Sequence, residues 1–407
     1  MSKINVRSFS NENEDGAPDL VGISTLSATS YFIPTRGTTA QRPSEHVEEG
    51  SLRYNYDTKT LEYYRGHTIG WDSFELIDPD LGGRKESAYS TTSSNDGGLG
   101  TRLLLAGGRE SAPAFTDLIE YVTISTQGNS DDFGDLFSSH GNGSSQGGAA
   151  SRTRGIWLSG QLGTSPNYSN VIQFVTFAST GDAQDFGDIN SARAAVGNLS
   201  NETRAVCFAG SLSDGSKPTQ IDAVTIAATG RAFDFGDMST HTQNTANLAS
   251  STRGIMAGGS VPSRTNTIQF ITINTSGDTV DFGDLTVIGP AGGATTASYN
   301  GVGYSNSTRG IIHGGRDVNN NHINSIQYIT IATTGNSSDF GDTAVAAFQQ
   351  MGGSSPTRGV VGAGANPSAT NAMEFVNIMS TGNALDFGDC TARDETLGAC
   401  SNGHGGL

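Results

Sequence analysis

The sequence predicts an all-β protein whose larger part consists of six copies of one four-stranded unit. The tetrapeptide Asp-Phe-Gly-Asp occurs six times, at steps of 53, 49, 47, 58 and 47 residues. A Thr-Arg pair followed by an apolar run also occurs six times, 28 to 31 residues before each tetrapeptide. Self-similarity at a period near 50 residues is the signature of a repeat architecture.

Each unit contains four predicted strands. The first is the apolar run after Thr-Arg, which ends in glycines, as at 103–108, 254–259 and 310–315. The second is an alternating segment rich in β-branched and aromatic residues, as at 268–273 and 326–331. A third surrounds Asp-Phe-Gly-Asp, and a fourth lies in the variable stretch before the next Thr-Arg. Six such units predict a six-bladed β-propeller. Seven blades is the alternative, and a β-solenoid is a weaker third interpretation.

The two markers predict structural roles. We expect the motif phenylalanine to insert between blades, its glycine to supply a positive φ, and its aspartates to bind backbone amides in a tight turn. The repeated arginine and aspartate predict a partly buried arginine–carboxylate fork. The arginines are Arg102, Arg154, Arg204, Arg253, Arg309 and Arg358, and the first motif aspartates are Asp132, Asp185, Asp234, Asp281, Asp339 and Asp386.

Composition divides the chain in two, with a boundary near 81–85. Residues 1–85 form a short β-rich N-terminal part, and residues 86–407 form the propeller. Either the segment 87–102 or the tail 397–407 has the position of a final strand, so one of them is expected to complete the ring. Within the first part, 52–55 and 61–64 predict a β-hairpin around a turn at 57–59, covered by Trp71. A lone hairpin is marginally stable, so this module (37–74) is expected to need a partner.

The charge and composition exclude several classes of protein. With 23 basic and 40 acidic residues the net charge is −17, which disfavours a nucleic-acid binder. No apolar stretch is long enough to span a membrane, and the first residues do not resemble a secretory signal. Three cysteines do not make a disulfide framework, and no histidine shows zinc-ligand spacing.

No catalytic residue, metal or cofactor is predicted. Six Asp-Phe-Gly copies without a kinase catalytic loop are structural, and no serine occupies a nucleophile elbow. Calcium at paired aspartates and a glycan-cleaving carboxylate pair stay open as alternatives. Insertions at 137–148 and 286–303 predict binding loops on one face of the ring, with His140, Asn142, Tyr299 and Asn300 as candidate contacts to a sugar or protein surface. The loops are equally well explained as spacers against a neighbouring protein.

The N-terminal motifs resemble a known module. The run Gly37-Thr-Thr-Ala-Gln-Arg-Pro43, then Leu52-Arg-Tyr-Asn55, Leu61-Glu-Tyr-Tyr64 and Trp71, is similar to a module of tail-fibre and other virion proteins of tailed bacteriophages. The glycine-rich repeats resemble those of marine-phage structural proteins, and the double glycines partly resemble kelch repeats. The resemblance implies a homotrimeric virion component attached through residues 1–85. We expect a tail-fibre or spike-like adhesin that contacts a host glycan or protein; the alternatives are a neck, baseplate or capsid-decoration protein and a glycan depolymerase.

Overall fold

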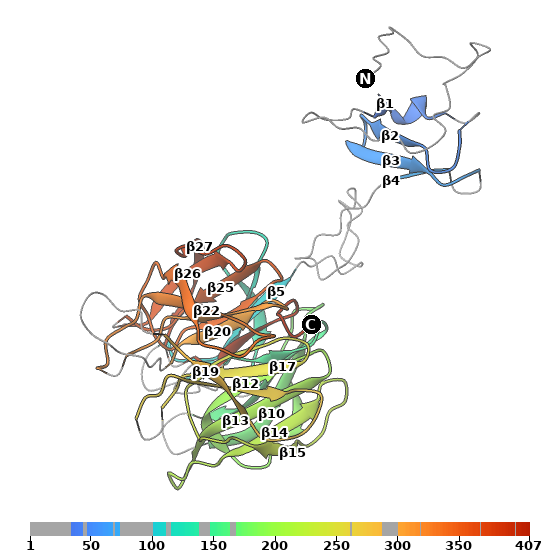
Figure 1. Cartoon of the computed structure of the whole chain (residues 1–407). Helices are drawn as coiled ribbons and strands as arrows, with labels where there is room; N and C mark the ends of the chain where they lie inside the picture. The colour runs from blue at the N-terminus through green and yellow to red at the C-terminus, as the bar shows by residue number, and fades with distance from the viewer. Residues whose placement is uncertain are drawn as a thin grey trace, which may run out of the picture. The chain divides into compact units, whose positions relative to one another are not determined.

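The protein folds as two compact β units, residues 1–75 and 76–407 (Figure 1). The computed structural model describes residues 34–43, 47–67, 70–73, 101–110, 115–137, 147–162, 168–260, 263–286, 300–317, 319–366, 368–394 and 396–407. Over these ranges all regular structure is β-strand, apart from one short 3-10 helix, Thr39–Gln41. No helix among the described residues is long and apolar enough to cross a membrane. The predicted boundary near 81–85 lies outside the described ranges.

The N-terminal unit contains one four-stranded sheet. Its strands are β1 (Thr35–Gly37), β2 (Leu52–Asn55), β3 (Thr60–Tyr64) and β4 (Trp71–Ser73), in that order across the sheet. The strand β1 runs parallel to β2, and the other two pairs are antiparallel. The pairing of β2 with β3 through the turn at 56–59 confirms the predicted hairpin.

The second unit contains six four-stranded antiparallel sheets, which give it a β-propeller-like architecture. We number them by chain order. The first sheet is β28 (Gly398–Ser401), β5 (Arg102–Ala106), β6 (Leu118–Thr123) and β7 (Asp131–Asp135); the second is β8 (Ala149–Ala150), β9 (Arg154–Gln161), β10 (Tyr168–Thr176) and β11 (Gln184–Asp188); the third is β12 (Arg193–Ser200), β13 (Arg204–Leu212), β14 (Gln220–Thr225) and β15 (Phe233–Asp237). The fourth is β16 (Ala246–Ala249), β17 (Arg253–Ala257), β18 (Thr267–Thr272) and β19 (Val280–Asp284); the fifth is β20 (Val302–Ser305), β21 (Arg309–His313), β22 (Ser325–Thr330) and β23 (Ser338–Asp342); the sixth is β24 (Met351–Ser354), β25 (Arg358–Gly362), β26 (Thr370–Asn377) and β27 (Leu385–Arg393).

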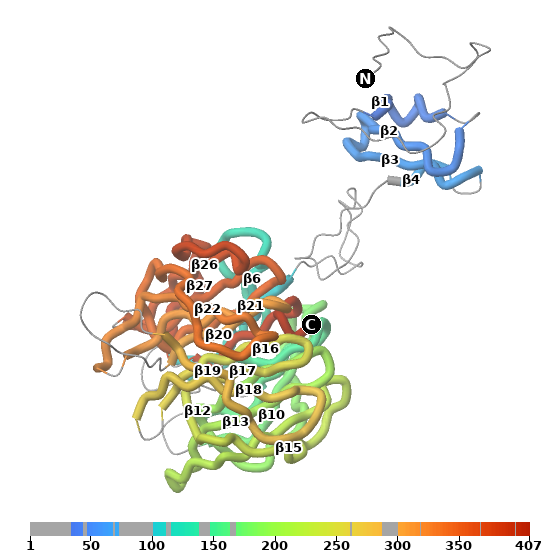
Figure 2. The backbone as a smooth tube through the Cα atoms, in the orientation of Figure 1, coloured from blue at the N-terminus to red at the C-terminus, as the bar shows by residue number. Residues whose placement is uncertain are grey.

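The first sheet joins the two ends of this unit. Its strand β28, near the C-terminal end of the chain, pairs with β5, so the tail supplies the missing strand of the first repeat (Figures 1 and 2). The first strands of the six sheets, which we call the inner strands, also contact one another in cyclic order: β8, β12, β16, β20, β24, β28 and again β8. Of the two candidate closing segments, the tail is therefore the one that occupies the final-strand position.

The core of the second unit lies between successive sheets. In one cluster, Ile255 and Phe282 of the fourth sheet pack with Ile312 and Ile329 of the fifth. The same arrangement recurs between the third and fourth sheets, where Phe235 packs against Ile271. Burial of these side chains from water is the main favourable term that holds each sheet to its neighbour.

Candidate functional site

The repeat arginines link each sheet to the next. In every unit the Nη1 atom donates a hydrogen bond of 2.8–3.0 Å to a backbone carbonyl of the following sheet. The six bonds run from Arg102 to Phe177, Arg154 to Ile226, Arg204 to Ile273, Arg253 to Ile331, Arg309 to Ile378 and Arg358 to Ile124. The last bond returns from the sixth sheet to the first, so the set is cyclic.

An aromatic ring of the same sheet supports each arginine. The guanidinium of Arg253 lies 4.8 Å from the ring centroid of Phe270, and that of Arg309 lies 4.4 Å from Tyr328. Such stacking favours the planar guanidinium over an ammonium. Among the described residues each of these arginines therefore contacts an aromatic ring and a backbone carbonyl, and no carboxylate fork to them is found there.

The Asp-Phe-Gly-Asp motif forms the fourth strand of each sheet, at the edge opposite the inner strand. It links the same pairs of neighbouring sheets as the arginines do. Each motif phenylalanine is about 2% exposed, and its carbonyl accepts a 2.7–2.9 Å bond from a turn glycine of the next sheet. The glycine donors are Gly181, Gly230, Gly277, Gly335, Gly382 and Gly128, and the acceptors are Phe133, Phe186, Phe235, Phe282, Phe340 and Phe387. The motif glycine has a positive φ as predicted; at Gly283 (φ 146°) a Cβ would lie 2.5 Å from the carbonyl oxygen of Gly335.

The predicted bond from a motif aspartate to a backbone amide occurs at one copy of the motif. All six first aspartates are exposed, and of these Asp185 accepts a bond from the amide of Gly187. At five junctions the amide of the last motif aspartate instead donates to an Asp or Asn side chain after the neighbouring turn glycine. These acceptors are Asp182, Asp278, Asn336, Asn383 and Asn129. The acceptor thus belongs to the next sheet, whereas we expected it to lie within the motif.

A buried polar side chain in the third strand of each sheet was missed by the sequence reasoning. The six residues are Glu120, Gln173, Asp222, Gln269, Gln327 and Glu374, all buried. We call the segment that connects the fourth strand of one sheet to the inner strand of the next a crossover. At least four of the six residues bind the crossover that enters their own sheet. Glu374, for example, accepts bonds from the amides of Ala344 and Val345, and Gln327 accepts one from Thr286. The common signal was a Glu, Gln or Asp directly after an apolar residue near the start of the alternating segment.

Three of these residues carry charge, and each has a buried partner. Glu120 pairs with Arg393, and Asp222 pairs with Arg193 at 2.5 Å. Glu374 bonds to His313 at 2.8 Å, and His313 in turn contacts the hydroxyl of Tyr304 at 3.1 Å. Burial raises the pKa of Tyr304 well above its ordinary value. Removing one partner of such a pair would leave an uncompensated buried charge, which is strongly destabilising.

Residues of five inner strands, together with Gly147 and Gly148 just before β8, line a cavity of about 50 Å³. Its lining includes Asn198, Asn247 and Tyr304. The tail after β28 reaches one end of this cavity, where the amide of Gly405 donates to Ser305 O at 2.9 Å and His404 Nε2 to Ala150 O at 3.1 Å. His404 Nδ1 accepts from the amide of Gly406, which fixes the neutral tautomer, and burial lowers the pKa of His404 to about 4.

The structure describes one of the four predicted binding residues, Asn300. His140, Asn142 and Tyr299 lie outside the described residues. Asn300 precedes β20 and is 3% exposed; its amide donates to Asn244 O at 3.1 Å. Its backbone therefore serves a crossover contact, and its binding role stays a prediction. Within the described ranges no three His, Cys, Asp or Glu side chains are placed to hold a metal ion. Burial raises the pKa of Cys207 to about 12 and that of Cys390 to about 11, so neither thiol is a ready nucleophile.

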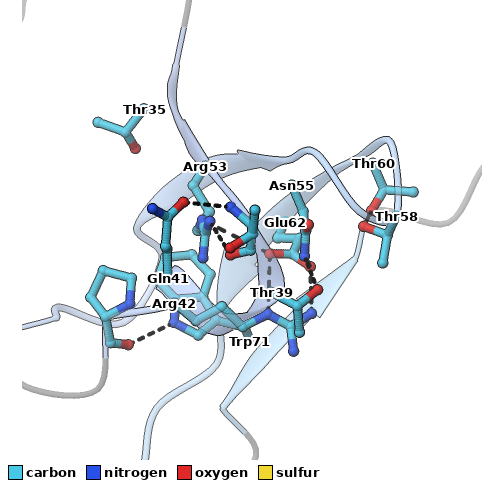
Figure 3. A network of polar contacts seen from close by, with 12 residues as sticks. Thr35, Thr39, Gln41, Arg42, Arg53, Asn55, Thr58, Thr60, Glu62 and Trp71 are labelled. Carbon is cyan, nitrogen blue, oxygen red and sulfur yellow. Dashed lines mark hydrogen bonds and ion pairs between the residues drawn. The ribbon is translucent and has the colours of Figure 1, made fainter.

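In the N-terminal unit the residues of the phage-like motif form one polar network (Figure 3). Glu62, fully buried, accepts bonds from Arg42 at 2.5 Å and Asn55 at 2.8 Å, and Arg53 Nε lies 4.0 Å away. Arg53 also donates to Thr38 O at 2.9 Å, and the indole of Trp71 donates to Pro43 O at 2.9 Å. Hydrogen bonds from Arg42 and Asn55 lower the pKa of Glu62 despite its burial.

Neither a scan of protein-family models nor a search of curated proteins finds a match to this chain.

Proposed function

We propose that the chain is a virion structural protein of a tailed bacteriophage that acts as a tail-fibre or spike-like adhesin. In this proposal the six sheets are the blades of a closed six-bladed β-propeller, and residues 1–85 attach it to other virion proteins as a homotrimer. The phage-like motif supports the attachment role, because its residues build one network in an independent unit.

The observation that carries the adhesin proposal is the difference in loop length between the two ends of the sheets. At one end, which we call the constant end, the inner strand turns into the second strand through three residues, at 151–153, 201–203, 250–252, 306–308 and 355–357. At the opposite end, the variable end, the crossovers differ widely, from 189–192 to 285–301. Sequence variation concentrated in loops on a rigid scaffold is typical of a binding surface.

The described residues also favour binding over chemistry. The buried pairs Glu120–Arg393 and Asp222–Arg193 hold crossovers, and the three cysteine thiols are buried. A propeller that presents variable loops on a rigid scaffold is suited to recognise a host glycan or surface protein. A purely structural role at the neck, baseplate or capsid, and a glycan depolymerase, are the competing proposals.

Gold labelling of intact particles with an antibody against residues 86–407 tests the proposal. Label at distal tail appendages is expected, together with saturable binding of the full chain to host cells. Label at the capsid, neck or tail trunk would instead assign the chain a structural role. Release of reducing sugar from host envelopes by the full chain would show depolymerase activity, and the adhesin proposal would then be wrong.

A further inference from the structure

Three neighbouring hairpins at the variable end are bonded to one another. They connect the second and third strands of the fourth, fifth and sixth sheets, between β17 and β18, β21 and β22, and β25 and β26. Arg264 of the first hairpin donates to the side-chain oxygen of Asn320 in the second. His322 of the second donates through Nδ1 to Asn366 Oδ1 of the third at 3.2 Å. The three hairpins therefore form one continuous surface across three sheets.

The turn of the middle hairpin is held in one backbone conformation. Asp317, 8% exposed, accepts bonds of 2.8 Å from the amides of Asn319 and Asn321, and one of 3.0 Å from the side chain of Asn321. Asn320 adopts a left-handed conformation with φ 68°, a region in which asparagine is enriched. A turn that is ordered before binding loses little conformational entropy when a ligand arrives.

A buried aromatic ring supports the same hairpin. Phe348, in the crossover that enters the sixth sheet, is 8% exposed. The guanidinium of Arg316 lies 3.3 Å from its ring centroid, and the imidazole centroid of His322 lies 5.2 Å away. Arg316 and His322 also form a β-bridge with each other, so both sides of the turn are fixed against the ring. Phe348 thus stabilises the hairpin and is covered by it.

Four asparagine side chains on these hairpins are exposed: Asn319, Asn320, Asn321 and Asn366. A carboxamide offers both an oxygen acceptor and an N–H donor pair, so it can bind neighbouring hydroxyl groups of a sugar ring. A tight protein interface needs aromatic or apolar anchors, and the aromatic ring at this place, Phe348, is covered. The exposed chemistry of the three hairpins therefore suits a glycan better than a protein.

We propose that the three hairpins form a glycan-binding site, in which Asn319, Asn320, Asn321 and Asn366 bind sugar hydroxyl groups. The inference rests on the proposed adhesin function and assigns it to the fourth, fifth and sixth sheets. Because the amides come from hairpins of two neighbouring sheets, one glycan chain can contact both hairpins at once. The bond between His322 and Asn366 keeps the two hairpins at a fixed spacing for that contact.

Binding of the full chain to host cells tests the ligand class. One sample of cells is oxidised with periodate, which cleaves the vicinal diols of sugars, and a second is treated with protease, which removes surface proteins. We expect periodate to abolish binding and protease treatment to leave it unchanged. Binding that survives periodate or is removed by protease overturns the proposal, because the receptor is then a protein.

Substitutions test the site itself. Asn319→Ala combined with Asn320→Gly removes two amides and should weaken binding at least about 10-fold, while glycine keeps the left-handed conformation at position 320. Asn366→Ala, in the neighbouring sheet, should weaken binding by a few-fold. Asn377→Ala is the matched control, because Asn377 is an exposed asparagine at the constant end and its loss should leave binding unchanged.

The melting temperature of each variant shows that it is folded. Folded variants of both hairpins that bind as tightly as the wild type overturn the assigned site and leave the adhesin proposal intact. A wild-type chain that does not bind host cells refutes the adhesin proposal itself, and the glycan site falls with it. The two failures are therefore distinguished by whether the unaltered chain binds.

Discussion

Replacing Phe282 with alanine tests the account of the repeat motif. Phe282 is 2% exposed and lies in a cluster with Ile255 of its own sheet and Ile329 of the next. Its ring also meets that of Phe270 edge-on, with centroids 6.0 Å apart. The substitution thus removes apolar contacts on both sides of one junction between sheets.

The expected loss in free energy of unfolding is about 3–5 kcal/mol, because a buried phenylalanine truncated to alanine loses transfer energy and leaves a cavity. The edge-on contact with Phe270 adds roughly 0.5–1.5 kcal/mol and places the result toward the upper part of that range. At an unfolding entropy of about 2.1 cal/mol/K per residue, a unit spanning 76–407 shifts by roughly 1.4 °C per kcal/mol, so the melting temperature falls by about 4–7 °C.

Thermal unfolding followed by near-ultraviolet circular dichroism measures the change, and Val280→Ala is its matched control. Val280 lies two residues earlier on β19 and is 55% exposed, so its truncation should change stability by less than about 0.5 kcal/mol. Equal melting temperatures for the Phe282→Ala variant and the wild type would refute the reasoning, because they would place the motif phenylalanine outside the core.

Three further substitutions test other parts of the ring. Arg253→Ala removes the 2.9 Å bond to Ile331 O and the stacking on Phe270, so urea unfolding should show a loss of about 1.5–3 kcal/mol, only partly restored by lysine. Between the second and third sheets, Arg231 follows the turn glycine at the position where the other five junctions have Asp or Asn. Arg231→Asn supplies that acceptor and should raise stability by about 0.5–1.5 kcal/mol in the same assay, and a loss would contradict the assigned role. For His404, the folded pKa of about 4 lies below its ordinary 6.5, so the unfolded chain binds more protons between these values and stability falls as pH falls from 6.5 toward 4. His404→Gln should flatten that part of the melting-temperature profile, and an unchanged profile would contradict it.

The repeat and its strands could be predicted from the sequence because each strand leaves a mark in residue identity. The glycines that end β17 and β21, and the alternation in β18 and β22, occur in the predicted places. The burial of Phe282 and the positive φ of Gly283 also follow from the motif, since only certain residues suit those positions. The use of the tail as the final strand was one of two options that the sequence left open.

The partners of polar groups could not be predicted in the same way. A backbone carbonyl exists at every residue, so nothing in the sequence marks Ile331 O as the acceptor for Arg253. Gln269 lies in an alternating strand, where a polar residue is expected to face solvent. Its side chain is instead buried and donates to the carbonyl of Thr240 in a crossover. In the N-terminal hairpin, alternation predicts two faces but not which is buried; in the structure Glu62 is fully buried and Leu52 is 46% exposed.

The distribution of these contacts explains how one scaffold accommodates unequal insertions. The arginine bonds and the turn-glycine bonds all lie toward the constant end, and both sets are complete around the six sheets. Their geometry depends on the short turns and the motif, not on crossover length. At least four of the crossovers are held separately, by a buried side chain such as Gln327 or Glu374. A loop inserted beyond that anchor costs chiefly its closure entropy, which grows slowly with length. The variable end can therefore change in sequence while the junctions between the sheets stay the same.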